Sequence, residues 1–249
     1  MGNSLTLCRQ IAQHLLTRHL QRQAESTIHQ KDVPTAFIVH PPDFSALAPE
    51  SLLTSLLSEP HQVIQGEKER AIHCLSSVHL VPVFDMPSAA QSLHQISETL
   101  RNTGQTPVML VVAGLDALAE NVVRATNPVN GTAMLSTILR CLMRLSRESA
   151  SFLSVLLVNM RGIGEESNPL LQGPLQSSHV RGCPAPFPSV AHVETLLFPS
   201  LLMRTLDQGI DTHLLVAGTP PVIQVIKDRT GDGTGKWCPY ALLEKGAPV

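Results

Sequence analysis

Aromatic residues are scarce in this sequence, at 3% of 249 residues, with a single Trp237 and a single Tyr240. The hydrophobic core must therefore be built from aliphatic side chains, and a surface that stacks nucleic-acid bases on aromatic rings has few candidates. Charged residues are also few, at 15%, and the net charge is −2. This charge gives no general attraction to nucleic acid or to an acidic membrane surface, so any contact with DNA must be local or shared with a partner.

Paired cysteines and long apolar runs are absent as well. The five cysteines form no CxxC pair, and the sequence has neither a signal peptide nor an apolar run long enough to cross a bilayer. This pattern predicts a reducing compartment, the cytosol or the nucleus. Cys8, Cys74 and Cys141 fall in helical apolar patterns, which favours buried thiols over ligands or nucleophiles. The eleven histidines include no HxxxH pair beside an acid, so no metal site is expected.

What the chain has in quantity is aliphatic residues, and hydrophobic residues make up 43% of it. This content and the length suit one large α/β domain, so we expect a single domain over 1–249. Helical spacing of apolar residues predicts a first helix that begins almost at Met1. Short apolar runs predict strands at Ala36–Val39 and His79–Phe84. Pro82 cannot donate a ladder hydrogen bond, so the second strand should be irregular or at an edge.

The middle of the chain predicts a strand–helix–strand unit. Val108–Ala113 is apolar without alternation, as in a central parallel strand whose two faces are covered by helices. We expect a polar loop with Asn127-Pro128 and Asn130-Gly131, then an amphipathic helix over 132–149 and a second strand over Phe152–Val158. The right-handed parallel crossover is the usual arrangement of such a unit.

The remaining third of the chain predicts a loop, a helix and short strands. Residues 160–190 lose periodicity and fill with Gly, Pro, Ser and Gln, which predicts a long flexible loop. A leucine-rich helix should run from 194 to about Leu206. Asp232-Gly233 and Gly235 favour a β-hairpin turn. The expected strands are Thr212–Val216, Val222–Ile226 and Trp237–Leu243.

Four stretches, taken in order, resemble the ATPase core of the eukaryotic RecA-type recombinases and their paralogues. HLVPVFDMPSAAQSLHQI is similar to that family's third core strand and next helix, and VMLVVAGLDAL to its Walker B strand. GTAMLSTILRCLMRLSRESASFLSVLLVN resembles the helix and strand that follow, and VIQVIKDRTGDGTGKWCPYAL the C-terminal hairpin of the paralogues. The resemblance spans roughly 76–243. It implies an α/β, RecA-like domain of the P-loop NTPase type, with a mostly parallel sheet flanked by helices and a C-terminal β-hairpin.

The same resemblance shows that the P-loop is degenerate. A P-loop needs glycines that cradle phosphates, a lysine for the β/γ-phosphates and a hydroxyl for Mg²⁺. The family's loop falls at MGNSLTLC, where Ser4 takes the lysine position and Leu5 the hydroxyl position, and the first core strand is missing. Gly2, Asn3 and Ser4 are therefore vestigial. They either hold an anion at a helix N-terminus, or Asn3 or Ser4 caps that helix.

Three further catalytic positions have lost their groups. Ala113 stands where the family's Walker B carboxylate lies, Pro42 where a Glu polarises the attacking water, and Met160 where a Gln senses the γ-phosphate. Asp116, the nearest acid to Ala113, either coordinates Mg²⁺ from a shifted position or is an ordinary loop carboxylate. The resemblance thus implies a pseudo-ATPase that uses neither ATP nor Mg²⁺ as a cofactor.

Candidate DNA contacts come from two groups of basic residues. Arg161, His179 and Arg181 lie where the family's second DNA-binding loop falls, although a connector without DNA contacts fits them equally. The predicted helix over 132–149 carries a row of arginines that meets phosphate, meets an acidic partner, or is simply the solvated side of the helix. These arginines are Arg140, Arg144 and Arg147.

A candidate subunit interface lies in the C-terminal hairpin, at Lys227, Asp228, Arg229 and Trp237. The simplest interpretation is that Trp237 packs under the turn as the one large core aromatic, with the three charged residues at an exposed strand end. The functional interpretation is that this edge meets a neighbouring RecA-like subunit.

The resemblance implies a non-hydrolysing subunit that acts by assembly with another RecA-like or recombinase-paralogue subunit. Its expected setting is homologous recombination and DNA repair in the nucleus, with DNA bound weakly or only through the complex and no membrane partner. One alternative is an ATP-independent RecA-like scaffold such as the Elongator accessory subunits, which form a ring that handles tRNA. Another is a DNA-dependent ATPase whose intact P-loop lies upstream of a wrongly chosen start.

Overall fold

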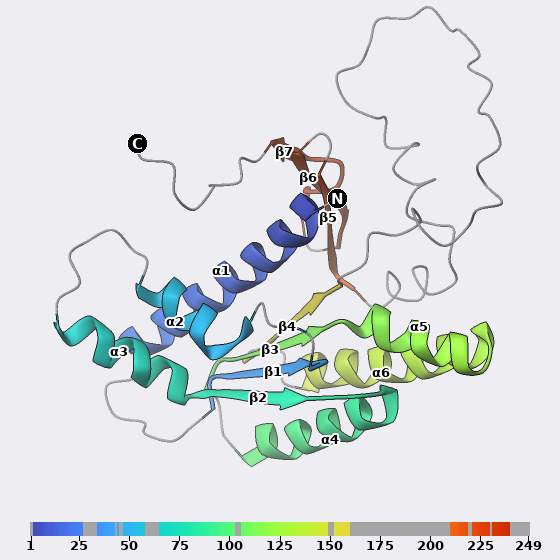
Figure 1. Cartoon of the computed structure of the whole chain (residues 1–249), viewed down its shortest axis with the longest axis horizontal. Helices are drawn as coiled ribbons and strands as arrows, with labels where there is room; N and C mark the ends of the chain where they lie inside the picture. Colours follow the sequence, from blue (N-terminus) through green and yellow to red (C-terminus); the bar gives the residue numbers. More distant parts are fainter. Residues whose placement is uncertain are drawn as a thin grey trace, which may run out of the picture.

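The computed structural model describes residues 2–26, 34–42, 44, 47–57, 65–102, 106–148, 152–159, 210–218, 221–229 and 231–239. Within them lie a four-stranded parallel sheet with helices on both faces and a three-stranded antiparallel sheet (Figure 1). The elements in chain order are α1 Gly2–Ser26, β1 Ala36–His40, α2 Pro49–Leu57, α3 Gln65–Ser76, β2 Val78–Pro82, α4 Met86–Asn102, β3 Val108–Ala113, α5 Leu115–Ala125, α6 Pro128–Glu148, β4 Leu153–Val158, β5 Thr212–Gly218, β6 Pro221–Asp228 and β7 Trp237–Pro239.

The parallel sheet has the strand order β2-β1-β3-β4. The prediction of a central strand at Val108–Ala113 is confirmed, since β3 lies between β1 and β4. The parallel crossover from β3 to β4 through a helix is confirmed too. β2 is an edge strand and Pro82 is its last residue, as the missing N–H of proline led us to expect.

Two hydrophobic clusters, one on each face of the sheet, form the core. Successive strand residues point to opposite faces, so β3 sends Leu110 and Val112 to one cluster and Val111 and Ala113 to the other. The first cluster is closed by α4, α5 and α6, and the second by α1, α2 and α3 (Figure 1). The clusters are almost wholly aliphatic, as the low aromatic content requires.

Helix α1 runs antiparallel to the strands. Its Arg9 guanidinium lies 5.8 Å from the ring centre of Phe44, which follows β1. Ten residues further along α1, the Nε2 atom of His19 lies 3.0 Å from the carbonyl oxygen of Thr35, just before β1. Burial lowers the pKa of His19, the hydrogen bond to Thr35 opposes that shift, and nearby Arg22 lowers the pKa further. A neutral His19 can donate its Nε2–H to the Thr35 carbonyl.

The prediction of a polar loop between β3 and the helix over 132–149 is wrong. The structure has the helix α5 there, and α6 begins at Pro128, four residues earlier than predicted. The Asn127 Oδ1 atom accepts a hydrogen bond from the Asn130 N–H at 2.9 Å, so Asn127 caps α6 and Pro128 takes the first helical position. Gly131 lies inside α6, where a Cβ atom would collide with the Val123 side chain of α5. These residues are therefore a helix start and a close helix crossing, not turns.

The three predicted C-terminal strands are confirmed as an antiparallel sheet in the order β5-β6-β7, and β5 lies against α1 (Figure 1). Gly235, with a φ of 82°, supplies the left-handed residue of the β6–β7 turn. The loop predicted at 160–190, the helix from 194 to about Leu206 and the strand residues 240–243 lie outside the described residues. The single domain over 1–249 stays a prediction.

Removing a core leucine should destabilise the fold, and two adjacent leucines of α1 allow a matched test. Leu16 is fully buried, whereas Leu15 is 42% exposed. We expect Leu16→Ala to lower the free energy of unfolding by about 2–5 kcal/mol, and Leu15→Ala by less than about 1 kcal/mol. Urea denaturation measures both values. Equal losses in the two variants would contradict the described burial.

The pKa of His19 predicts an acid-sensitive stability. The pKa of His19 lies below 6.5 in the folded chain. As the pH falls through 6.5, His19 therefore gains a proton in the unfolded chain before it gains one in the folded chain. The stability that neutral His19 contributes is therefore present above pH 6.5 and lost as the pH falls toward its folded pKa. In urea denaturation on both sides of this pH, His19→Gln should reduce the pH dependence, while His14→Gln, at an exposed site of α1, should not. An unchanged profile in His19→Gln would refute this.

Candidate functional site

The carboxyl ends of the parallel strands share one edge of the sheet, the place where open α/β sheets bind ligands. An α-helix rises 1.5 Å per residue, so Gly2 lies about 25 Å from His19 along α1, whereas a five-residue strand spans about 17 Å. The first turn of α1 therefore extends past the carboxyl edge, toward β5 (Figure 1). The strands reach this edge at His40, Pro82, Ala113 and Val158.

The residues predicted as a vestigial P-loop lie in the first turn of α1. Gly2, Asn3 and Ser4 are helical, so they are part of the helix and not of a loop before it. Their side chains lie outside the described part of the chain, so both an anion at this helix end and a capping role stay predictions. Nearby on the same edge, Ala113 ends β3 with 1% exposure. It puts a methyl group where the resemblance implies a carboxylate.

Gly114 directly follows β3 and lies against Pro41, which directly follows β1. Its φ of 68° is in the left-handed region, and its N–H donates a 2.8 Å hydrogen bond to the Val158 carbonyl. A Cβ atom on Gly114 would lie 2.9 Å from Cγ of Pro41. Both the conformation and this close approach require glycine. The proline ring of Pro41 thus occupies the space beside the turn that follows β3.

Asp116 is half-buried in the first turn of α5, so the interpretation of it as a loop carboxylate is wrong. A carboxylate in the first turn is stabilised by the positive end of the helix dipole, which gives Asp116 a structural role. The described residues contain no group of three His, Cys, Asp or Glu side chains that could hold a metal ion. Coordination of Mg²⁺ by Asp116 stays a prediction.

Sequence reasoning missed two polar residues at this edge, Arg9 and Asn159. Arg9 lies against the Phe44 ring, and Asn159 follows β4 directly. The Nε atom of Arg9 and the Oδ1 atom of Asn159 are buried without a hydrogen-bond partner in the structure. Buried polar atoms normally have such partners, so these two atoms are exceptions within the described residues. Arg9 could have been found from its spacing, because it shares the inward side of α1 with Ala12 and Leu16.

The candidate DNA contacts are only partly described. Arg161, His179 and Arg181 lie outside the described ranges. On α6, Arg140, Arg144 and Arg147 are exposed, as expected of a solvated helix side. The Arg144 Nε atom donates a 2.5 Å hydrogen bond to Glu148, which holds the pKa of Glu148 below its ordinary value.

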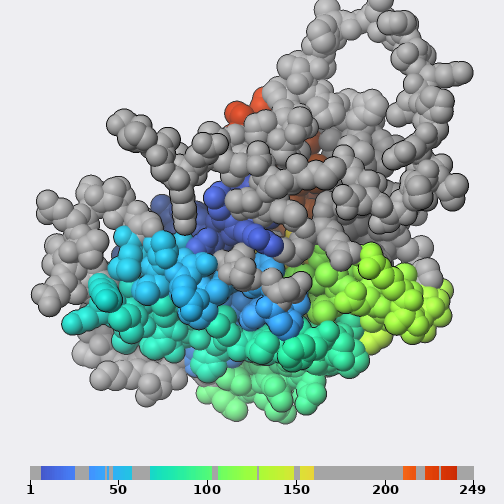
Figure 2. All heavy atoms as spheres, in the orientation of Figure 1, coloured from blue at the N-terminus to red at the C-terminus, as the bar shows by residue number. Residues whose placement is uncertain are grey.

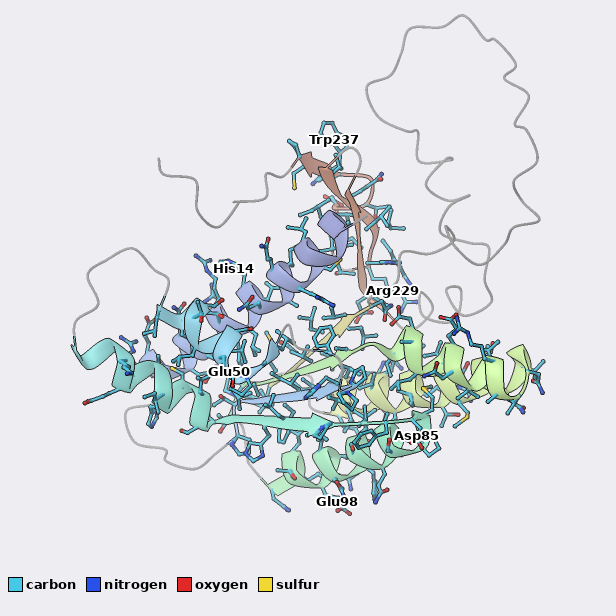
Figure 3. All side chains as sticks on the ribbon, in the orientation of Figure 1. His14, Glu50, Asp85, Glu98, Arg229 and Trp237 are labelled. Atoms are coloured by element: carbon cyan, nitrogen blue, oxygen red, sulfur yellow. The ribbon has the colours of Figure 1, made fainter. Side chains whose placement is uncertain are left out.

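The four candidate interface residues do not form one patch. Trp237 is 47% exposed on β7, so the prediction that it packs under the turn is wrong. The Asp228 carboxylate accepts hydrogen bonds from the N–H groups of Gly231 at 3.1 Å and Gly233 at 3.0 Å, so it orders the β6–β7 turn. Arg229 lies 3.6 Å from Asp211 and well apart from Trp237 (Figure 3). Lys227 is half-buried and lies opposite His213 on β5.

The cysteines of the helices support the prediction of structural thiols. Cys74 is buried, and Cys8 and Cys141 are half-buried. Burial is the main cause that raises the pKa of each of these thiols. Each is therefore protonated at neutral pH and a poor nucleophile.

No helix among the described residues is long and apolar enough to cross a membrane. The chain matches no known protein-family model. No curated protein is significantly similar to it in sequence.

Proposed function

We propose that this chain is a RecA-like subunit of the eukaryotic recombinase-paralogue type that does not hydrolyse ATP. It acts by assembly with another RecA-like subunit, in homologous recombination and DNA repair in the nucleus. One observation carries the proposal: the carboxyl edge of a parallel α/β sheet, where a RecA-like ATPase would do its chemistry, has uncharged groups at the implied catalytic positions. Those that fall in the described residues and have described side chains are Pro42 and Ala113.

The layout of the described fold supports a RecA-like origin. A parallel sheet lies between two helical layers, and an antiparallel hairpin follows it in the chain, as the resemblance implies. The N-terminal half of α1 lies toward the carboxyl edge, and its first turn extends past that edge, as a helix that follows a P-loop would be oriented. The close packing of Pro41 against Gly114 leaves apolar groups between the ends of β1 and β3, which supports a site without catalytic polar groups.

A chain without catalytic groups acts by what it binds, and RecA-like proteins work as assemblies. Co-purification from nuclear extract of cells that express the tagged full chain tests this role. We expect a RecA-like or recombinase-paralogue protein in stoichiometric amount. Stoichiometric recovery of Elongator subunits instead would favour the tRNA-related alternative and overturn the recombination role.

The purified chain should have no ATPase activity above a buffer control. The carboxylate and water-polarising positions hold Ala113 and Pro42, and neither side chain can bind Mg²⁺ or polarise water. Phosphate release with and without single-stranded DNA measures the activity. Turnover that disappears in Asp116→Ala and persists in the exposed-site control Asp85→Ala would refute the prediction.

Binding of DNA by the isolated chain should be weak and only slightly dependent on salt. A net charge of −2 with dispersed arginines releases few counterions. Fluorescence anisotropy over a range of salt concentrations measures both quantities. In the complex with its partner, Arg161→Ala with Arg181→Ala should weaken binding of single-stranded DNA and leave subunit pairing intact. Tight, steeply salt-dependent binding by the lone chain, or an unaffected double variant, would contradict this.

A further inference from the structure

The two edge strands of the parallel sheet expose different backbone groups. Directly before β2, the Ser77 carbonyl accepts a hydrogen bond from the Thr35 N–H, and directly after it, the Val83 N–H donates one to the His40 carbonyl. The odd-numbered residues of β2 therefore direct their backbone N–H and C=O groups toward β1. Even-numbered residues therefore direct their backbone groups away from the sheet, since successive residues alternate in direction. One of these is Pro82, which has no N–H. Pro82 thus interrupts the row of outward N–H groups along β2, and proline commonly protects edge strands from pairing with another strand in this way.

The edge formed by β4 has no such protection. The Val108 N–H donates to the Phe152 carbonyl and the Gly114 N–H to the Val158 carbonyl, so even-numbered residues face β3. The odd-numbered residues Leu153, Val155 and Leu157 direct their N–H and C=O groups outward, where no described strand pairs with them. The β4 sequence, LSVLLV, contains no proline and no charge. A regular, uncharged edge of this kind is a template for another strand.

Helices cover both faces of β4, and this restricts what can be added. Val155 and Leu157 pack into the cluster under α6, and Leu156 packs into the cluster under α1, yet all three stay partly exposed. A strand added here would therefore be covered on both faces as well. It would need apolar side chains on both faces, as central parallel strands have.

The two helices that flank this edge are both basic. Helix α1 contains Arg9, Arg18 and Arg22 against one acid, Glu25. Helix α6 contains Arg140, Arg144 and Arg147 against Glu148. Two copies of this chain joined β4 to β4 across a two-fold axis would bring like-charged helices together, which is unfavourable. The charge fits a different protein with acidic groups.

We propose that the open edge of β4 binds an extended segment of a different protein, which adds as a strand to the parallel sheet. The segment has apolar side chains on both faces and acidic residues at its ends. This inference rests on the proposed function, because it names the surface through which the assembly forms. It differs from the interface predicted at the C-terminal hairpin, which lies on the second sheet.

A synthetic peptide with a run of valine and isoleucine between acidic ends tests the edge on the full chain. A peptide with the same apolar run between lysine ends is the control for charge. The variant Val155→Pro removes an outward N–H without removing a hydrogen bond to β3. The variant Leu80→Pro makes the same change at an outward position of β2 and is its matched control. Circular dichroism establishes that both variants fold.

We expect the acidic peptide to bind, and to bind at least about tenfold more tightly than the lysine peptide. Val155→Pro should weaken binding by about tenfold or more, and Leu80→Pro should have no effect. If Val155→Pro does not fold, hydrogen exchange of the unaltered chain decides. The peptide should then slow exchange at the Val155 and Leu157 amides and leave those of Val78 and Leu80 unchanged.

Three results would overturn the inference. They are no binding of the acidic peptide, equal loss of binding in both proline variants, and a dimer of the chain in sedimentation that Val155→Pro dissociates. The last result would make a second copy the occupant of the edge. If a RecA-like partner co-purifies equally with the parent chain and with Val155→Pro, the β4 edge is not the binding surface, but the proposed function stands. If the peptide binds at β4 but no RecA-like partner co-purifies, the β4 edge is a binding surface and the proposed function is refuted.

Discussion

The strand β3 must bury apolar side chains on both of its faces, because Leu110 and Val112 point one way and Val111 and Ala113 the other. This requirement puts one helical layer on each side of the sheet and a neighbouring strand on each side of β3. With few aromatics in the chain, aliphatic packing alone has to fill both layers. Figure 2 shows the residues of the described helices packed against one another on the side in view. Groups that can bind a ligand or a partner therefore lie at the ends of the strands and along the edge strands of the sheet.

At the carboxyl ends of β1 and β3, apolar groups pack closely together. Pro41 lies against Gly114, and Ala113 is buried where the resemblance implies a carboxylate. Arg9 and Asn159 keep buried polar atoms without partners near this edge, so it has not become wholly apolar. The same fold thus combines a largely apolar carboxyl edge with an unprotected strand at β4.

Apolar patterns were enough to predict α1, β1, β3 and β4, because each has a pattern set by which faces it buries. The edge position of β2 followed from Pro82, which has no backbone N–H. The helix α5 was not foreseen, because Asn127-Pro128 and Asn130-Gly131 are also turn signals. The Asn127 cap is a local hydrogen bond that shares its sequence signal with a turn, whereas only tertiary packing shows that Gly131 lets Val123 approach. The helices α2 and α3 were not predicted at all. The spacing of Arg9 along α1 indicates its inward position, whereas the burial of the Asn159 Oδ1 atom depends on contacts distant in sequence, which spacing alone does not reveal.

The length of α1 has a mechanical consequence. The helix has 25 residues, so it extends well past the strands that it covers and touches β5 of the second sheet. It is held near its C-terminal end by the His19 contact to Thr35 and by Arg70, which lies 3.7 Å from Glu25. Leu7, Ala12 and Leu16 are buried as well, so α1 is held along the face of the sheet and not only at one end. Because the same rigid helix packs against β4 and contacts β5, it joins the parallel sheet to the antiparallel one.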